Sequence, residues 1–282
     1  MDQVVDRPAD TGTFETCVAA IARDGYVRIP KVFDEETVAE ALRRVRDWFD
    51  SSVGVQSERM PRLNRAQSMF YNLQSKDMFF NRLILETPII EDILKHFLND
   101  RWFSSVPRED PNYILRSFLA RSSNHRMPMH IDSFMPYTGS HSFIMQCSIP
   151  LEDQTRENGC TVIVPRSHQS DRYADPDSFE TAVPIEADAG DLVVWDSRIW
   201  HGAGENVSGG TRWSIIATFC RWWIKQAFDI PGNMPQEIYD QLSNRQRAVM
   251  GFCSVPYDDE TRGIDMKRGY DLLPDKVSDY KL

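Results

Sequence analysis

Apolar residues in the first hundred positions recur at intervals of three and four, which is the spacing of one face of a helix. This spacing predicts three amphipathic helices. Asp34 is a suitable N-cap for the second of them, and Pro88 suits the first turn of the third. The helices are expected over about 13–24, after Asp34 and after Thr87, with a strand at Tyr26–Ile29 between the first two.

From about residue 112 to 220 the pattern changes to short runs of β-branched and aromatic residues that end at Gly, Pro, Asn or Asp. Such runs are typical of strands joined by turns, and the pattern alone predicts an antiparallel barrel or sandwich. Turns are expected at Asn158–Gly159 and Gly209–Gly210. The expected strands are 112–120, 142–149, 160–164, 182–185, 192–195 and 212–219, followed by at least one helix within 235–250.

The segment from Ser51 to Asn72 has no clear period. It carries three arginines among methionine and phenylalanine side chains. Long irregular segments in compact domains often serve as lids, so the segment is interpreted either as a surface loop or as a mobile flap over a pocket.

Composition narrows the class of protein. The 282 residues are 41% hydrophobic and 26% charged, an ordinary balance for a chain that buries a sizeable core. The 32 basic and 42 acidic residues give a net charge of −10. Phosphate binding needs clustered Lys and Arg, so this charge argues against nucleic acid and anionic membranes as partners. No apolar run approaches the roughly 20 residues that span a bilayer.

The cysteines and the first residues indicate a compartment. The five cysteines are odd in number and widely spaced, with neither a zinc pattern nor a disulfide framework. We expect them to be reduced core residues. The first residues lack the basic and apolar regions of a secretory signal. The expectation is a cytoplasmic protein that is a monomer or a homodimer.

Two short stretches hold candidate metal ligands. Met127–Asp132 supplies His130 and Asp132, whose side chains point the same way if the stretch is extended. Trp195–His201 supplies His201, which follows His130 by 201 − 130 = 71 residues. Two histidines and one carboxylate on one face of a metal leave the opposite positions open, as in the non-haem Fe(II) oxygenases. We predict that His130, Asp132 and His201 bind a metal ion, and that His96, His125, His141 and His168 do not.

A candidate anion-binding group follows the second histidine. Arg212 lies 212 − 201 = 11 residues after His201, in a run that is expected to be a strand with Ser214 on the same face. A guanidinium fork matches a carboxylate bidentately. Gln146, on another expected strand, is interpreted either as a hydrogen-bonding partner of a bound small molecule or as a core amide satisfied by the backbone.

Together these residues resemble the phytanoyl-CoA dioxygenase (PhyH-like) family of Fe(II)/2-oxoglutarate-dependent dioxygenases. The resemblance covers most of the chain. Met129 departs from it, because many members carry tryptophan before the first histidine. Besides the candidate ligands, the motifs that carry the resemblance are Asp24–Pro30 with Phe33–Glu36, Ile149–Asp153, Glu157–Cys160, Val164–His168, and Ala189–Trp195 with His201–Gly202.

The resemblance implies a mainly β fold with helical cover. It implies a double-stranded β-helix, a jelly-roll or cupin-like barrel, at about 112–220, with N-terminal and C-terminal helices in a single domain over 1–282. The implied cofactors are Fe(II), 2-oxoglutarate and O₂, with ascorbate as the reductant in vitro. Related halogenating enzymes replace the metal-binding carboxylate, so Asp132 implies oxidation without halogen transfer. The implied 2-oxoglutarate ligands are Arg212, Ser214 and Gln146.

Four side chains near these motifs are candidate substrate contacts. Trp200 precedes one metal ligand and Phe134 follows another. Aromatic residues of this kind also occur as plain core, and an arginine equally suits a surface ion pair. The candidates are Phe134, Trp200, Arg126 and Trp223.

The resemblance implies an enzyme that oxidises an unactivated C–H bond by hydroxylation, oxidative ring closure or desaturation. The absence of a basic cluster disfavours CoA esters and favours a small natural-product intermediate, such as a secondary metabolite or antibiotic precursor. Three alternatives remain. One is an acyl-CoA or compatible-solute hydroxylase of the same family, and another is a protein or nucleic-acid demethylase of the wider superfamily, although the acidic charge argues against nucleic acid. The third is a cupin-like protein that binds or senses a metal without turnover. Arg212 argues against the last, because a non-catalytic barrel needs no anchor for 2-oxoglutarate.

Overall fold

The computed structural model describes residues 13–52, 68–100, 102 and 109–255. The chain forms two compact units. The first comprises Met1–Phe70, Ala120–Ser140 and Gln146–Ile216, and the second comprises Tyr71–Leu119, His141–Met145 and Ala217–Leu282. The expectation of a single domain stays a prediction.

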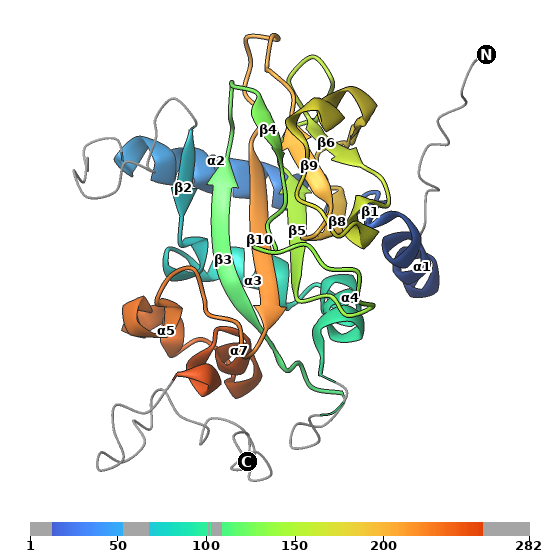
Figure 1. Ribbon diagram of the computed structural model, residues 1–282. Helices are drawn as coiled ribbons and strands as arrows, with labels where there is room; N and C mark the ends of the chain where they lie inside the picture. The colour runs from blue at the N-terminus through green and yellow to red at the C-terminus, as the bar shows by residue number, and fades with distance from the viewer. Residues whose placement is uncertain (1–12, 53–67, 101, 103–108, 256–282) are drawn as a thin grey trace. The chain divides into compact units, whose positions relative to one another are not determined.

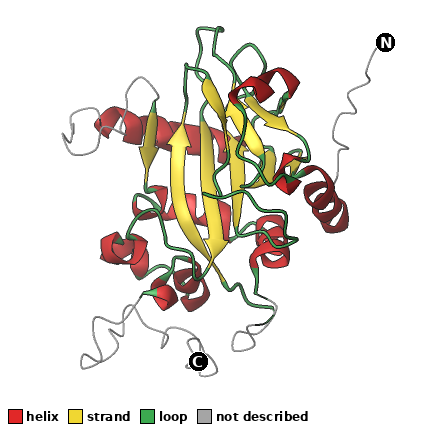
Figure 2. Ribbon diagram, in the orientation of Figure 1, coloured by secondary structure: helices red, strands yellow, loops and turns green. Residues whose placement is uncertain are grey.

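Two β-sheets dominate the described residues, as the sequence pattern predicts (Figures 1 and 2). The six-stranded sheet has the order β1 (Tyr26–Ile29), β8 (Leu192–Asp196), β5 (Ile144–Pro150), β10 (Ser214–Arg221), β3 (Tyr113–Arg121) and β2 (Met69–Tyr71). The four-stranded sheet has the order β4 (Met127–His130), β9 (Trp200–Ala203), β6 (Thr161–Val164) and β7 (Val183–Pro184). Successive strands such as β4 and β5, or β8 and β9, lie in different sheets. The fold is therefore the expected mainly β jelly roll.

In the first unit, the opening helix passes directly into the edge of the larger sheet (Figure 1). α1 (Phe14–Asp24) ends at Gly25, whose φ is +89°. A Cβ atom on Gly25 would lie 2.6 Å from the ring of His168, so glycine is needed here for both conformation and space. β1 follows at once and pairs with β8 in antiparallel register, Tyr26 opposite Trp195.

The predicted cap of the second helix is confirmed. The Asp34 carboxylate accepts a hydrogen bond from the Thr37 N–H at 2.7 Å, just before α2 (Glu35–Ser52). This bond satisfies one of the donors that a helix leaves unpaired at its start. The first unit also holds two short 3₁₀ helices, η3 (Ser167–Gln169) and η4 (Pro176–Thr181).

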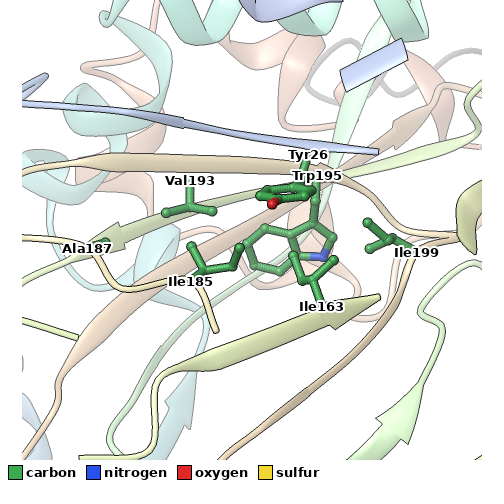
Figure 3. Close-up of a cluster of buried hydrophobic side chains, with 7 residues drawn as sticks. All are labelled: Tyr26, Ile163, Ile185, Ala187, Val193, Trp195 and Ile199. Carbon is green, nitrogen blue, oxygen red and sulfur yellow. The ribbon is translucent and has the colours of Figure 1, made fainter. Parts of the chain in front are cut away.

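A buried apolar cluster joins the two sheets within the first unit. Trp195 of β8 lies at its centre, with the ring of Tyr26 from β1 beside it and Ile163 of β6 below (Figure 3). Strands of both sheets contribute, so burial of this cluster fixes the position of β8, the strand that leads toward His201. The other members are Ile185, Ala187, Val193 and Ile199.

The second unit is largely helical outside its strands (Figure 2). The stripe predicted after Thr87 is confirmed, because α4 (Pro88–Leu98) buries Ile90, Ile93, Leu94 and Leu98. The spacing did not predict α3 (Met78–Leu85), which has only eight residues and buries five of them. An apolar run this short does not distinguish a helix from a strand. The remaining elements are η2 (Leu73–Ser75), α5 (Ile230–Asn233), α6 (Gln236–Tyr239), α7 (Asn244–Val249) and η5 (Phe252–Ser254).

Several expectations about local structure need correction. Arg212 was placed within a strand, but β10 begins at Ser214. The Ser122 hydroxyl accepts the Arg212 N–H at 2.9 Å, so this backbone group is satisfied outside the sheet. β2 lies within the segment that was expected to be irregular, whereas residues 53–67 of that segment fall outside the described residues.

All five cysteines are free and buried, as expected. No helix among the described residues has the length and apolar composition needed to cross a membrane.

Candidate metal centre

The two histidines meet because they occupy opposite positions on neighbouring strands. His130 ends β4 and pairs in register with His201 of β9, and the centroids of their rings lie 4.2 Å apart. Asp132 follows the end of β4, where its backbone N–H donates to the Ser197 carbonyl at 2.8 Å. Asp132 is therefore held by the turn between β8 and β9, and not by a continued strand.

The distances among the three side chains suit a metal ion. Asp132 Oδ2 lies 3.3 Å from His201 Nε2, and Asp132 Oδ1 lies 3.6 Å from His130 Nε2. Ligand atoms at roughly 2.1 Å from a metal and at right angles to one another stand about 3 Å apart. Within the part of the chain that the structure describes, these three residues are the group that could hold a metal.

Backbone carbonyls select the ring nitrogen that each histidine offers. His130 Nδ1 lies 2.9 Å from the Pro128 carbonyl oxygen, and His201 Nδ1 lies 3.0 Å from that of Ile199. A carbonyl can only accept, so each Nδ1 carries the proton and donates it. Both Nε2 atoms are left as lone-pair donors toward Asp132, which is the usual arrangement of metal-binding histidines.

The glycine after His201 allows the two strands to approach. A Cβ on Gly202 would lie 2.6 Å from the Met127 carbonyl oxygen and 3.2 Å from Met129 Sδ. Met129, the residue that departs from the family pattern, is buried in this contact. A larger side chain at position 202 would force β9 away from β4 and separate the two histidines.

Gln146 orients the metal-binding carboxylate. Its Nε2 donates to Asp132 Oδ2 at 2.7 Å from β5, a strand of the six-stranded sheet. Burial raises the pKa of Asp132, but His201, His130 and Gln146 outweigh it and lower the pKa to about 2. Burial acts to lower the pKa of His201 while Asp132 raises it above its usual value. The Asp132 carboxylate is thus ionised and held in position by Gln146. Contact between Gln146 and 2-oxoglutarate stays a prediction.

Replacing Gln146 by leucine is expected to weaken Fe(II) binding. Partners that orient metal ligands contribute about 10–100-fold in affinity, and leucine keeps the bulk of the side chain while removing its donor. Anaerobic titration with Fe(II) measures the change. Gln169→Leu, at an exposed glutamine whose amide donates to the Ala22 carbonyl, is the matched control. Equal affinity in the Gln146→Leu variant and the wild type would show that Asp132 is oriented by other groups.

Arg212 presents one buried donor that the described residues leave unused. Its Nε donates to the Ser123 carbonyl at 3.1 Å, which holds the guanidinium in place. Its Nη2 is buried, and no described residue accepts a hydrogen bond from it. Burial and the positive charge of Arg121 lower the pKa of Arg212 to about 10. The Arg212 guanidinium is buried, has an unused donor and lies near a second positive charge, so binding an anion would stabilise it. A carboxylate has the geometry that matches a guanidinium.

Ser214 opens into a small cavity in the first unit. Ser148, Thr161 and Gln154 line it together with apolar side chains that include Ile185, Val193 and Trp195. Gln154 Nε2 also donates to the Arg212 carbonyl at 3.3 Å, so the cavity wall and the arginine are linked. The cavity is about the size of one water molecule, so binding of 2-oxoglutarate by Ser214 stays a prediction.

A buried ion pair that was not predicted joins the two ligand-bearing segments. Arg198 donates from Nε and Nη2 to Asp196, at 2.9 and 2.8 Å, and both side chains are almost fully buried. Its Nη1 donates to the carbonyls of Gly139 and Tyr137, and its guanidinium lies 4.5 Å from the Tyr137 ring centroid. The turn before His201 is thereby fastened to the loop after Asp132. Two opposite charges at i and i+2, flanked by Trp195 and Ile199, were the signal available in the sequence.

The candidate substrate contacts lie in different surroundings. Phe134 is 65% exposed and Trp200 is partly buried, with its Nε1 donating to the Arg172 carbonyl at 3.2 Å. The Arg126 guanidinium lies 3.7 Å from the centroid of the Phe179 ring. Trp223 belongs to the second unit, where its ring packs against Phe143. Their roles toward a substrate stay predictions.

Comparison with known proteins identifies relatives of this chain. The model of the family described as "Phytanoyl-CoA dioxygenase (PhyH)" matches residues 21–214. "Dioxygenase af480" of Aspergillus fumigatus is 27% identical over 255 residues, covering 88% of this chain and 80% of that protein. "Iron/alpha-ketoglutarate-dependent dioxygenase ausU" of Aspergillus calidoustus is 22% identical over 285 residues, covering 94% and 90%.

Solved structures share the fold. The epimerase SnoN, in complex with Fe3+, alpha ketoglutarate and nogalamycin RO, superposes with a TM-score of 0.58 at 20% identity, covering 78% of this chain and 88% of that one. At this identity the likeness establishes the jelly-roll fold.

Proposed function

Since the chain belongs to the phytanoyl-CoA dioxygenase family, and is thus a non-haem Fe(II)/2-oxoglutarate-dependent oxygenase, we propose that it oxidises an unactivated C–H bond of a small natural-product intermediate. The observation that carries the proposal is the pairing of a His130, Asp132 and His201 centre with the buried, unused donor of Arg212. The first suits iron and the second suits a carboxylate of the cosubstrate. A protein that only binds a metal needs no such second site.

Each residue of the centre has a definite task. His130, Asp132 and His201 would hold Fe(II), and Arg212 with Ser214 would hold the far carboxylate of 2-oxoglutarate. When bound, these cofactors and O₂ convert a C–H bond to C–OH or remove two hydrogens, while 2-oxoglutarate becomes succinate and CO₂. The protein orients the groups and excludes water from them.

The Asp132 carboxylate bears on the type of oxidation, and the relatives of the chain bear on the substrate class. Asp132 is ionised and oriented by Gln146, so it occupies a metal position that halide transfer would need. The relatives include fungal dioxygenases, and SnoN, an epimerase from nogalamycin biosynthesis, binds nogalamycin RO in its solved structure. These relatives support a natural-product substrate. Hydroxylation of an acyl-CoA or a compatible solute is the alternative within the family.

Succinate release tests the activity. Purified protein with Fe(II), 2-oxoglutarate and ascorbate should release succinate, and candidate natural-product intermediates should stimulate that release and gain 16 or lose 2 mass units. An acyl-CoA that stimulates release more than every such intermediate would overturn the proposed substrate class. The absence of succinate under all conditions would contradict the activity itself. Cytoplasmic location and a monomeric or homodimeric state, without nucleic-acid or membrane partners, belong to the same proposal.

Arg212→Lys is expected to raise the KM for 2-oxoglutarate by about tenfold or more. A lysine keeps the charge but cannot supply two parallel donors, and a charge-assisted hydrogen bond contributes roughly 1.5–3 kcal/mol. The KM is measured by succinate release at saturating Fe(II). Arg156→Lys, at an exposed arginine, should leave the KM unchanged. An unaltered KM in the Arg212 variant would mean that another residue binds the cosubstrate.

A further inference from the structure

An exposed aromatic residue in an unfavourable backbone conformation lies next to the metal centre. Phe134 follows Asp132 by two residues, so their Cα atoms are at most about 7 Å apart. Its φ is +64°, in the left-handed region that large side chains rarely adopt. The residue is nevertheless 65% exposed, so burial of the ring does not account for the choice of phenylalanine.

Hydrogen bonds hold this conformation from both sides. The Met135 N–H donates to the Ser133 carbonyl at 2.8 Å, which closes a three-residue turn across Phe134. Ser133 is buried, and its own N–H donates to the Ser197 carbonyl at 3.2 Å. The Tyr173 hydroxyl donates to the Phe134 carbonyl at 2.8 Å. The ring is therefore carried by a fixed backbone and not by a loose loop.

The residues around Phe134 are also unusually exposed for their type. Met135 is 57% exposed and Tyr173 is 61% exposed. Trp200, which immediately precedes the ligand His201, is partly buried. Exposed apolar side chains grouped at one place mark binding sites, and unfavourable backbone conformations concentrate at such sites.

We propose that Phe134 is a specificity-determining residue that stacks its ring on a planar aromatic or conjugated ring of the substrate. This inference rests on the proposed function, because it assigns a substrate class to the same metal centre. A rigid ring platform gains most from a rigid ring, since neither partner loses much conformational freedom on binding. A flexible acyl chain gains less from a single fixed platform. The substrate class is thus cyclic compounds with a planar ring near the oxidised carbon.

A pair of matched glucosides tests this assignment. 4-Methylumbelliferyl β-D-glucoside carries a planar ring, and methyl β-D-glucoside carries the same sugar without one. Dissociation constants are measured by equilibrium dialysis with protein that holds Ni(II) and 2-oxoglutarate, so that no turnover occurs. The wild type should bind the first compound at least tenfold more tightly than the second. Phe134→Gly should lose about three- to tenfold for the first compound, while Phe134→Tyr should retain its affinity.

Thermal unfolding separates this role from a structural one. Glycine adopts a positive φ without strain, so Phe134→Gly should melt at the same temperature as the wild type or higher. A melting temperature lower by several degrees would show that the ring is needed for folding, and would overturn the proposal. Equal binding of the two glucosides by the wild type, or unchanged binding by Phe134→Gly, would also overturn it. Succinate release by the wild type is recorded in parallel. Its absence would contradict the proposed function, whereas the two glucoside affinities test the assignment of Phe134.

Discussion

Alanine at His130, Asp132 or His201 is expected to abolish iron-dependent succinate release. Among the described residues these three side chains form the metal-binding group, so each replacement removes one of three ligands. Loss of an orienting partner alone costs about 10–100-fold in affinity, and loss of a ligand should cost more. The measurements are Fe(II) bound after anaerobic dialysis and succinate released from 2-oxoglutarate.

His125→Ala is the matched control for these variants. His125 is exposed, lies on the same stretch of chain, and is not part of the metal-binding group. It should bind Fe(II) as the wild type does. Normal iron binding and turnover in any one of the three alanine variants would refute the assignment of that residue as a ligand.

Arg198→Met is expected to lower the free energy of unfolding by about 3–5 kcal/mol. Methionine fills much of the space but leaves the Asp196 carboxylate buried without its partner, and it frees the carbonyls of Gly139 and Tyr137. Urea denaturation measures the loss. The variant should also bind Fe(II) more weakly, because the loop after Asp132 is no longer fastened to the turn before His201.

The control for Arg198 is an arginine in an exposed pair. Arg166 lies 3.4 Å from Asp24, and its side chain is 69% exposed, so Arg166→Met should barely change stability. Equal losses in the two variants would show that the loss reflects arginine removal in general and not the buried pair. A destabilised Arg198→Met protein with unaltered Fe(II) affinity would limit the pair to a structural role.

The sequence was most informative where a residue type has few uses. The β region, the cap at Asp34, Pro88 in the first turn of its helix, and the two histidines with one carboxylate all rest on strong local preferences, and the structure has them where they were expected. Arg212 was found from its distance to His201, although the strand assigned to it begins two residues later. The backbone there bonds to side chains of distant segments, which no local pattern records.

Other features depend on contacts between segments far apart in the chain. The role of Gln146 toward Asp132 requires β5 of one sheet to meet the loop that follows β4 of the other, and the sequence of neither strand records that contact. The turn at Phe134 is equally hidden, because a phenylalanine gives no signal for a positive φ. α3 was missed for a different reason: a largely apolar run of eight residues is too short for its period to distinguish a helix from a strand.

Because His130 lies opposite His201, iron binding should also determine how long the folded protein survives in the cell. An ion held by both closes a long loop of chain and binds the folded form, not the unfolded one. At a free metal concentration of 100 times the dissociation constant, such binding adds about 2.7 kcal/mol to stability. Cellular proteases act on the unfolded fraction, and a difference of this size changes abundance several-fold. Iron limitation is thus expected to lower the amount of the enzyme in the cell as well as its activity.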